Sequence, residues 1–546
     1  MKKAKKVMAL LLATISAGTV FTACTPKEDY GDRTVLRVGM YNGGWGTEWL
    51  DKVVAKFEAE YPQYKILVDG DKTKYNTNSL LGVIDTGRQD LFIAPMFLYD
   101  FVSQDKLMDI TDIMTTPLNE LVSASTDTAT IKSKMWAELD EFYSGFSEEE
   151  KYYSIPFGGG IYSLNYDRDL FNEKSLFIQD DTSADNGNIV WVNESGNLSA
   201  GQDGQKGTYD DGLPVSDKDF KALLKEMKRQ NVTPFIWSKQ NGYMKNFLYS
   251  LMASYEGKDN FNLLTKMDGE YTFAGDSVAT KITPETAYKL QGMTGKKVAL
   301  DFAYDIVKDS ANYHEDSGRE TCDFLDAQNK YLMSVDMAKT GDSNRVAFLI
   351  DGAHWYNEAK GTIDQMAEES DDYKNRRFGI MPFPKFEGGK ATKATYYASS
   401  FNIQVCIRKR AEQPELAKLF LAYLHTEESL RACTEYSGMV RPLAYTMPTE
   451  TLEKMPYYYQ SLWYTFSNAD IVHHVSKNPY IYNNSWFFED EWLWTCHTSN
   501  GMPLSNPFLD LIDRTKDVST QDYWDALKYT FNATYWKEKV LDKVDG

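Results

Sequence analysis

The sequence predicts an α/β fold, and three observations support this prediction. Apolar residues make up 42% of the 546 residues and charged residues 25%, proportions typical of globular proteins. Between residues 34 and 94, segments rich in strand-forming residues alternate with segments whose apolar residues repeat at helical spacing. The order strand, helix, strand, helix, strand favours a parallel sheet with crossover helices, and the chain is long enough for two large lobes.

The first sheet is expected to begin near residue 34. The expected elements are, in order, strand 34–41, helix 49–57, strand 65–68, helix 80–84 and strand 90–94. A turn at residues 42–44 ends the first strand, and Pro62 follows the first helix. Because ligands of parallel sheets bind beyond the carboxyl ends of the strands, residues 42–45 and 95–97 are expected at the mouth of a site.

A break in this pattern marks the passage to the second half of the chain. Residues 153–160 contain a proline and three glycines, which favours a crossing between lobes, and an extended run resumes at residues 161–166. Residues 180–213 are rich in Asp, Asn, Gly and Ser and predict a long surface insertion. Later expected elements are a helix capped by Ser216 and Asp219, strands 232–237 and 345–350, a helix from Pro414, and an aromatic, helix-like region beyond residue 456.

The N-terminus has the pattern of a secretory signal. Four lysines among the first six residues precede an apolar stretch of about 15 residues, which is short for a membrane span. Small residues directly before Cys24 resemble a bacterial lipobox, so we predict a signal peptide over 1–23, lipidation of Cys24 and a tether over 24–33. The alternatives are an ordinary signal peptide with an incidental cysteine, or a single membrane anchor. Cleavage would remove four lysines and no acids, which takes the formal net charge from −20 to −24.

Charge and motifs exclude several classes of function. The chain has 59 Lys and Arg against 79 Asp and Glu, and a nucleic-acid partner would require an excess of cations. The sequence contains no G-x-S-x-G elbow, H-E-x-x-H, phosphate-binding loop or dinucleotide fingerprint. We therefore predict no catalytic residues.

Metal chemistry is also not predicted, and neither is a cofactor. Beyond Cys24, four cysteines are widely scattered, namely Cys322, Cys406, Cys433 and Cys496, and Cys406 lies in an apolar run typical of a core. The segment Asp203–Asp211 superficially suggests calcium but lacks the ligand order of an EF-hand, so a solvated loop is favoured. The adjacent His473 and His474 would point apart on a helix.

The order of motifs resembles a known family. LRVGMYNGG, DLFIAP with KLMDITDIM, YYSIPFGGGIYSLNYDRDLFNE, VAFLIDGAHW, FGIMPFP and PELAKLFLAYLHTEESLRACTEYSGMVRP follow one another between residues 34 and 446. Together they resemble the family-1 extracellular solute-binding proteins of ABC importers, the group that includes the maltose-binding protein. The insertion at 180–213 and the long aromatic C-terminal part depart from the family pattern.

The resemblance implies an α/β, periplasmic-binding-protein-like fold of two lobes with a hinge between them. The N-terminal lobe would comprise residues 34–154 plus 394–440, and the C-terminal lobe residues 155–393 plus 441–546. Such proteins close around ligand at the hinge.

Sugars pack their C–H faces on aromatic rings and hydrogen-bond through their hydroxyls, which guides the choice of site residues. Trp355, which matches a tryptophan of the family, is the first candidate for stacking. Trp45 and Trp237 also follow strands and are further candidates. For each of the three rings, the alternative is a place in the core. The other candidates are Asn42, Glu48, Arg441, Tyr162, Ser399 and Ser400. A solvated helix start or a structural ion pair explains Glu48 and Arg441 equally well, and Asn165 and Tyr166 match the family but are interpreted as structural.

Two classes of function remain. The first is a monomeric receptor, lipid-anchored on the extracytoplasmic face of the cell membrane, that delivers a carbohydrate to the permease subunits of an ABC transporter. The second is a cell-surface glycoside hydrolase or lyase with the same aromatic site. The absence of a recognisable acid/base motif favours the receptor, and another polar solute, such as a peptide or polyol, is an alternative ligand.

Overall fold

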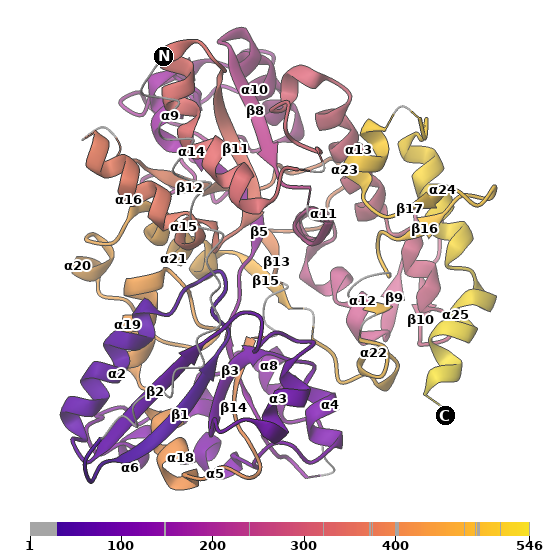
Figure 1. Cartoon of the computed structure of the whole chain (residues 1–546). Helices are drawn as coiled ribbons and strands as arrows, with labels where there is room; N and C mark the ends of the chain where they lie inside the picture. Colours follow the sequence, from indigo (N-terminus) through magenta and orange to yellow (C-terminus); the bar gives the residue numbers. More distant parts are fainter. Residues whose placement is uncertain are drawn as a thin grey trace.

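The computed structural model has two lobes, one above the other in Figure 1. It describes residues 30–146, 149–239, 241–319, 321–370, 373, 375–398, 403–473, 475–485, 487–488, 492–513 and 515–544. The predicted signal peptide, Cys24 and most of the tether therefore lie outside the described residues. No described helix is both long enough and apolar enough to cross a bilayer.

The first lobe is built on a five-stranded sheet with the order β2-β1-β3-β14-β4. Its strands are β1 (Thr34–Met40), β2 (Tyr64–Gly70), β3 (Leu91–Pro95), β4 (Ile155–Gly158) and β14 (Ile403–Ile407). β1 pairs in parallel with β2 and β3, whereas β14 runs antiparallel to both β3 and β4. The main helices are α2 (Glu48–Glu60), α3 (Leu80–Thr86), α4 (Leu98–Ser103), α8 (Ala137–Tyr143), α18 (Pro414–Tyr423) and α19 (Glu427–Ser437).

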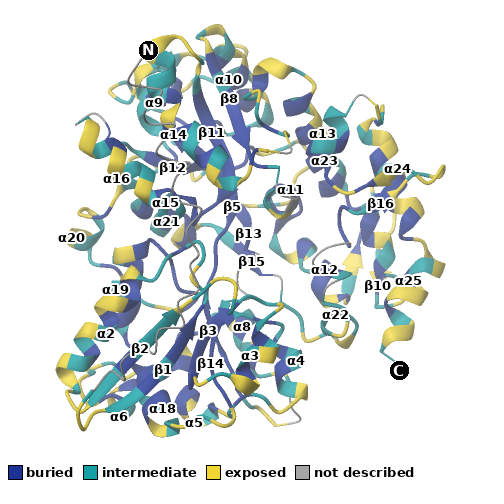
Figure 2. Ribbon diagram, viewed as in Figure 1, coloured by how far each residue is buried: buried dark blue, intermediate teal, exposed yellow. Residues whose placement is uncertain are grey.

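These elements match the sequence pattern closely. The predicted stripe of α2 is buried through Trp49, Leu50, Val53 and Phe57, and it packs on α19. Cys406 is fully buried in β14, where it takes the place of a small apolar residue. The dark-blue centre of the sheet in Figure 2 shows the resulting core.

The second lobe contains a four-stranded sheet with the order β12-β5-β11-β8. Its strands are β5 (Tyr162–Asp167), β8 (Val232–Trp237), β11 (Arg345–Gly352) and β12 (Phe378–Met381), and β11 is parallel to β8 but antiparallel to β5. The helices around it include α10 (Asp217–Arg229), α11 (Asn241–Phe261), α13 (Thr294–Val307), α14 (Phe324–Thr340), α15 (Trp355–Glu358) and α16 (Lys360–Glu369). α10 begins with the predicted capping box of Ser216 and Asp219.

The chain passes from the first sheet to the second a few residues later than the expected lobe boundary at 154/155. Residues 155–158 pair with β14 and so belong to the first sheet, and the chain reaches the second sheet at Tyr162. β13 (Thr395–Ala398) joins neither sheet but pairs with β15 (Asp470–His473) between the lobes. Only three residues, 159–161, therefore connect β4 to β5.

The C-terminal part is aromatic and mostly helical, as expected, with short strands added. Its elements include α21 (Tyr457–Asn468), α22 (Pro479–Tyr482), α23 (Pro507–Ile512), α24 (Thr520–Thr530), α25 (Ala533–Lys539), β16 (Cys496–His497) and β17 (Pro503–Leu504). α23 and α24 pack on α13, so this yellow layer of Figure 1 extends the second lobe sideways. The insertion at 180–213 is a looped surface segment whose β7 (Trp191–Val192) pairs with β6 (Phe177–Ile178).

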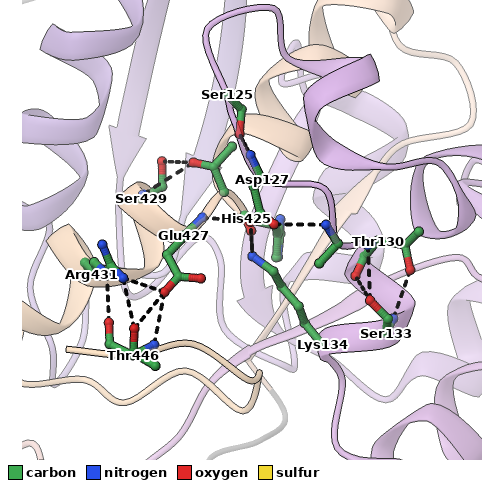
Figure 3. Close-up of polar contacts among 12 residues, drawn as sticks. Ser125, Asp127, Thr130, Ser133, Lys134, His425, Glu427, Ser429, Arg431 and Thr446 are labelled. Atoms are coloured by element: carbon green, nitrogen blue, oxygen red, sulfur yellow. Dashed lines mark hydrogen bonds and ion pairs between the residues drawn. The ribbon is translucent and has the colours of Figure 1, made fainter. Parts of the chain in front are cut away.

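A polar network joins early and late segments of the first lobe (Figure 3). Buried Lys134 pairs with Asp127, and the Asp127 carboxylate also accepts the backbone N–H of Glu427 at 3.2 Å. The Glu427 carboxylate in turn accepts from Arg431 at 2.6 Å and from the Thr446 hydroxyl at 3.0 Å. The network thereby fixes the start of α19 to residues that precede it by about 300 positions.

Candidate ligand-binding site between the lobes

Loops from both lobes meet where the strands end. The loop after β1 leads through Trp45 into α2, and the 159–161 crossing leads into Tyr162 at the start of β5. From the second lobe, the loop after β11 carries His354, and α11 carries Tyr243. Strand ends of α/β sheets are the usual place for ligand sites, so this junction is the candidate site.

Four rings, Trp45, Tyr162, Tyr243 and His354, form what we call the aromatic cluster. The centroid of the His354 ring lies 6.2 Å from that of Trp45, 6.1 Å from that of Tyr162 and 6.1 Å from that of Tyr243. Trp45 and Tyr162 are only 5% and 7% exposed, and Tyr243 is half-buried. The first lobe supplies Trp45 and the second lobe supplies the other three, so the cluster is shared between lobes.

Glycines allow these loops to approach so closely. A Cβ on Gly44, whose φ is +67°, would lie 3.1 Å from the Cβ of His354. A Cβ on Gly160 would lie 3.1 Å from Nδ1 of the same imidazole. A larger residue at either position would therefore push the lobes apart or displace His354.

Two carboxylates, of Asp351 and Glu358, lie close to His354. Asp351 is buried at the end of β11, and Glu358 ends α15. Burial raises the pKa of Asp351 well above its ordinary value, and the negative charge of Glu358 raises it further. Burial is the main cause of a raised pKa of Tyr243, and the negative charges of the same two acids raise it further. Asp351, His354 and Glu358 place oxygen and nitrogen atoms within 4.8 Å of one another.

The model of one family matches most of the chain. It is described as "Bacterial extracellular solute-binding protein" and aligns with residues 43–430. The chain belongs to this family. The resemblance identified from the motifs is thereby confirmed.

Solved structures of similar fold include sugar-binding proteins. "SBP RafE in complex with raffinose" is 13% identical, with a TM-score of 0.52 over 92% of this chain and 100% of that chain. "Chitin oligosaccharide binding protein" is 15% identical, with a TM-score of 0.51 over 94% of this chain and 100% of that chain. A probable secreted solute-binding lipoprotein from Streptomyces coelicolor is 12% identical, with a TM-score of 0.52 over 91% of this chain and 98% of that chain. No curated protein matches. The likeness confirms the two-lobe fold.

The structure places two predicted stacking residues of this solute-binding protein inside the second lobe. Trp355 is 0% exposed, and its ring centroid lies 5.2 Å from that of Phe378 and 5.5 Å from that of Tyr458. Trp237 is 0% exposed and packs against Tyr313 and Phe508, at 5.2 and 5.3 Å. Helices cover both strand ends, so these rings present no face to a ligand and are core residues in this structure.

Arg441 is also buried, in contact with Phe157 of β4 and apart from the aromatic cluster. Its guanidinium lies 3.7 Å from the ring centroid of Phe157 and donates from Nη2 to Nε2 of His425 at 3.0 Å. Burial lowers the pKa of Arg441 to about 10. These contacts give Arg441 a structural role. Both partners, Phe157 and His425, lie outside the aromatic cluster.

The remaining predicted residues are placed at the surface or lie outside the described residues. Asn42 is exposed in the loop that precedes Trp45. Glu48 is exposed at the start of α2 and pairs with Lys360 of α16 at 2.6 Å, an ion pair between the lobes. Ser399 and Ser400 fall in the undescribed segment after β13.

The contribution of Tyr243 and His354 was not predicted from the sequence, and neither were two cavities beside the lobe junction. One cavity, of about 430 Å³, is lined by α8, His473 and residues 475–480. The other, of about 410 Å³, is lined by Trp136, Arg441 and α21. Between them Glu138 pairs with Lys258 at 2.6 Å and approaches His473 at 3.3 Å. His354 stands in the quoted motif VAFLIDGAHW, so the motif itself was the signal, and the neighbouring tryptophan drew the prediction away from it.

Proposed function

We propose that this protein is a receptor that captures a carbohydrate, most simply an oligosaccharide, between its lobes and delivers it to an ABC permease. The observation that carries the proposal is the aromatic cluster, which both lobes build at their strand ends. Rings bind the C–H faces of sugars, and edge polar groups such as Asn42 bind hydroxyls. Among proteins of similar structure, one is solved in complex with raffinose and another is a chitin oligosaccharide binding protein, which supports a sugar ligand.

The lobe contacts suggest how capture would work. His354 touches the first-lobe loop at Gly44, and the Glu48–Lys360 pair closes the same side of the junction. Opening at the hinge would separate Trp45 from the three second-lobe rings and expose them to solvent. Closure around a sugar would then bury the rings again, which is the hinge mechanism of binding proteins.

A glycan panel tests the ligand class. The protein is screened by thermal shift against neutral oligosaccharides, polyols and short peptides, and hits are titrated by calorimetry. Replacement of Trp45 or Tyr243 by alanine should cost about 2–4 kcal/mol of binding free energy, roughly 30- to 1000-fold in affinity. Trp524→Ala, a half-buried ring on distant α24, is the matched control and should bind normally. Binding only of peptides, or full sugar affinity in both ring variants, would contradict the proposal.

The same titration separates a receptor from an enzyme. After prolonged incubation the bound glycan is released by denaturation and its chain length is measured. We expect the glycan to be recovered intact. Shortened or unsaturated products in the wild-type sample would indicate a hydrolase or lyase.

Lipid anchoring of the receptor rests on the pattern around Cys24. Cys24→Ser should abolish lipid modification and either release the protein or leave its precursor uncleaved. Metabolic labelling with a fatty acid and membrane fractionation measure both effects. Membrane retention of a correctly processed Cys24→Ser protein would refute the lipobox.

A further inference from the structure

Three second-lobe side chains form a compact group with the chemistry of metal ligands. Asp351 is the last residue but one of β11, His354 lies in the next loop and Glu358 ends α15, so a strand end followed by one helical turn brings them together. Their ligand atoms lie within 4.8 Å of one another. Nε2 of His354 is 4.0 Å from Oε2 of Glu358.

The negative charge of this group is poorly compensated. Asp351 is 1% exposed and the Glu358 side chain 15%, and in the described part of the chain neither has a lysine or arginine within ion-pair distance. Their shared donor is the neutral amide of Gln328, whose Nε2 lies 3.1 Å from Asp351 and 2.9 Å from Glu358. Two carboxylates this close and this buried are neutralised either by a shared proton or by a bound cation.

Surrounding groups hold the donors in place. The backbone N–H of Gly352 donates to Oδ1 of Asp351 at 2.6 Å, which leaves Oδ2 toward Gln328. A Cβ on Gly352 would lie 2.3 Å from Cε1 of His354, so only glycine lets the imidazole lie over this strand end. Gln328 is itself fully buried, and its Oε1 has no hydrogen-bond partner among the described atoms. The Gly352 N–H and the Gln328 amide therefore fix the two carboxylates at this strand end.

We propose that Asp351, His354 and Glu358 bind a divalent transition-metal cation, for which Zn²⁺ is the best match. One imidazole nitrogen with two carboxylates suits zinc, which accepts nitrogen and oxygen at about 2.0–2.2 Å, whereas calcium takes six to eight oxygens. Side-chain rotation must bring the three ligand atoms closer than they lie in the structure. Three protein ligands leave a coordination position for water or a ligand hydroxyl.

The position of the site gives the cation a role at the lobe junction. His354 is the second-lobe ring that Trp45 and Gly44 of the first lobe contact. A cation that fixes its imidazole also fixes the surface against which the first lobe closes. The metal site stands independently of the carbohydrate proposal, because metal binding is measured without sugar.

Calorimetric titration of ZnCl₂ into the chelator-treated, dialysed mature chain tests the site. We expect one site per chain, a higher melting temperature with Zn²⁺, and a visible absorption band when Co²⁺ replaces it. His354→Gln and Asp351→Asn should weaken binding at least about 100-fold, and Gln328→Ala, which removes the shared donor of two ligands, about 10- to 100-fold. His497→Gln, an exposed imidazole elsewhere in the second lobe, is the matched control and should bind like wild type.

Asp351→Asn also separates metal binding from folding. Without metal, the neutral amide relieves the carboxylate pair, so this variant should melt no lower than the metal-free wild type, yet Zn²⁺ should not raise its melting temperature. The proposal is overturned if wild type shows no binding at millimolar Zn²⁺, if His354→Gln and Asp351→Asn bind as tightly as wild type, or if Ca²⁺ binds more tightly than Zn²⁺.

Discussion

At the residue scale, Trp355 shows how a strand-end ring becomes a core residue. Its ring packs among Phe378, Tyr458 and Tyr331, so alanine would leave a large cavity beneath α15. We expect Trp355→Ala to lower the unfolding free energy by about 3–5 kcal/mol, while the protein that folds binds ligand normally. Denaturant melts without ligand and calorimetry with ligand measure the two effects. Weak binding with a near-native melt would instead place the ring at a binding surface.

His425 makes the stability of the first lobe depend on pH. Its Nδ1 contacts the Leu421 carbonyl at 2.6 Å and its Nε2 accepts from Arg441, which defines a neutral imidazole. Burial, and then the charge of Arg441, lower its pKa well below 6.5. As the pH falls below about 6.5, the imidazole of His425 binds a proton in the unfolded chain but stays neutral in the folded protein. The free energy of unfolding therefore decreases by up to about 1.4 kcal/mol per pH unit.

Urea melts of wild type and His425→Gln between pH 7 and 5 check this. The variant is expected to be less stable at pH 7, but its unfolding free energy should fall less steeply with acid. His497→Gln, whose imidazole is exposed, should keep the wild-type slope. Parallel slopes for all three proteins would show that His425 titrates normally in the folded state.

At the scale of elements, the carboxylate of Asp210 holds the loop at residues 202–210 within the insertion. Asp210 is 3% exposed and accepts hydrogen bonds from the backbone of Gln202 and Asp203 and from the hydroxyls of Thr208 and Tyr464. Four protein donors therefore occupy the two oxygens of the Asp210 carboxylate.

Removal of that carboxylate should loosen the insertion. Asp210→Ala leaves buried donors unpaired, which we expect to cost about 1–3 kcal/mol and to speed proteolysis between residues 200 and 211. Asp185→Ala, at an exposed carboxylate of the same insertion, should leave both unchanged. Limited proteolysis with mass spectrometry locates the cuts. Protection of wild type by added calcium would show that a cation, rather than these donors, orders the loop.

Elements with a strong local pattern were predictable from the sequence, and contacts between distant segments were not. α2, α10 and β11 were predictable because their apolar spacing, caps and flanking turns lie within a few residues of each other. The choice among Trp45, Trp237 and Trp355 was not predictable, because all three follow strands and only distant helices decide which ring is covered. Tyr243 was missed for the same reason, because its neighbours in space are remote in sequence, whereas His354 lay in a recognised motif beside the tryptophan that was chosen.

At the scale of the whole molecule, the ion pair of Glu48 and Lys360 links the lobes. Both side chains are largely exposed, at 71% and 44%, so the pair should contribute at most about 1 kcal/mol to closure and weaken with salt. We expect Glu48→Gln and Lys360→Met to reduce ligand affinity equally, by up to about fivefold, and the double variant to lose no more than either alone. Calorimetry at low and high salt measures this. A much larger loss for Glu48→Gln alone would show that Glu48 contacts the ligand.

The strand order of the first sheet has a consequence for biosynthesis. β14, from residues 403–407, lies between β3 and β4, and the network of Figure 3 joins Asp127 to the start of α19. A ribosome therefore releases β3 and β4 long before the strand that unites them, and until then both have an open edge that can pair with other chains. The sheet closes around a loop that contains most of the second lobe, which makes its completion a late and slow event. A nascent chain that stalls before residue 403 is thus a substrate for chaperones and proteases, whereas one that has passed residue 437 holds every strand and main helix of the first lobe.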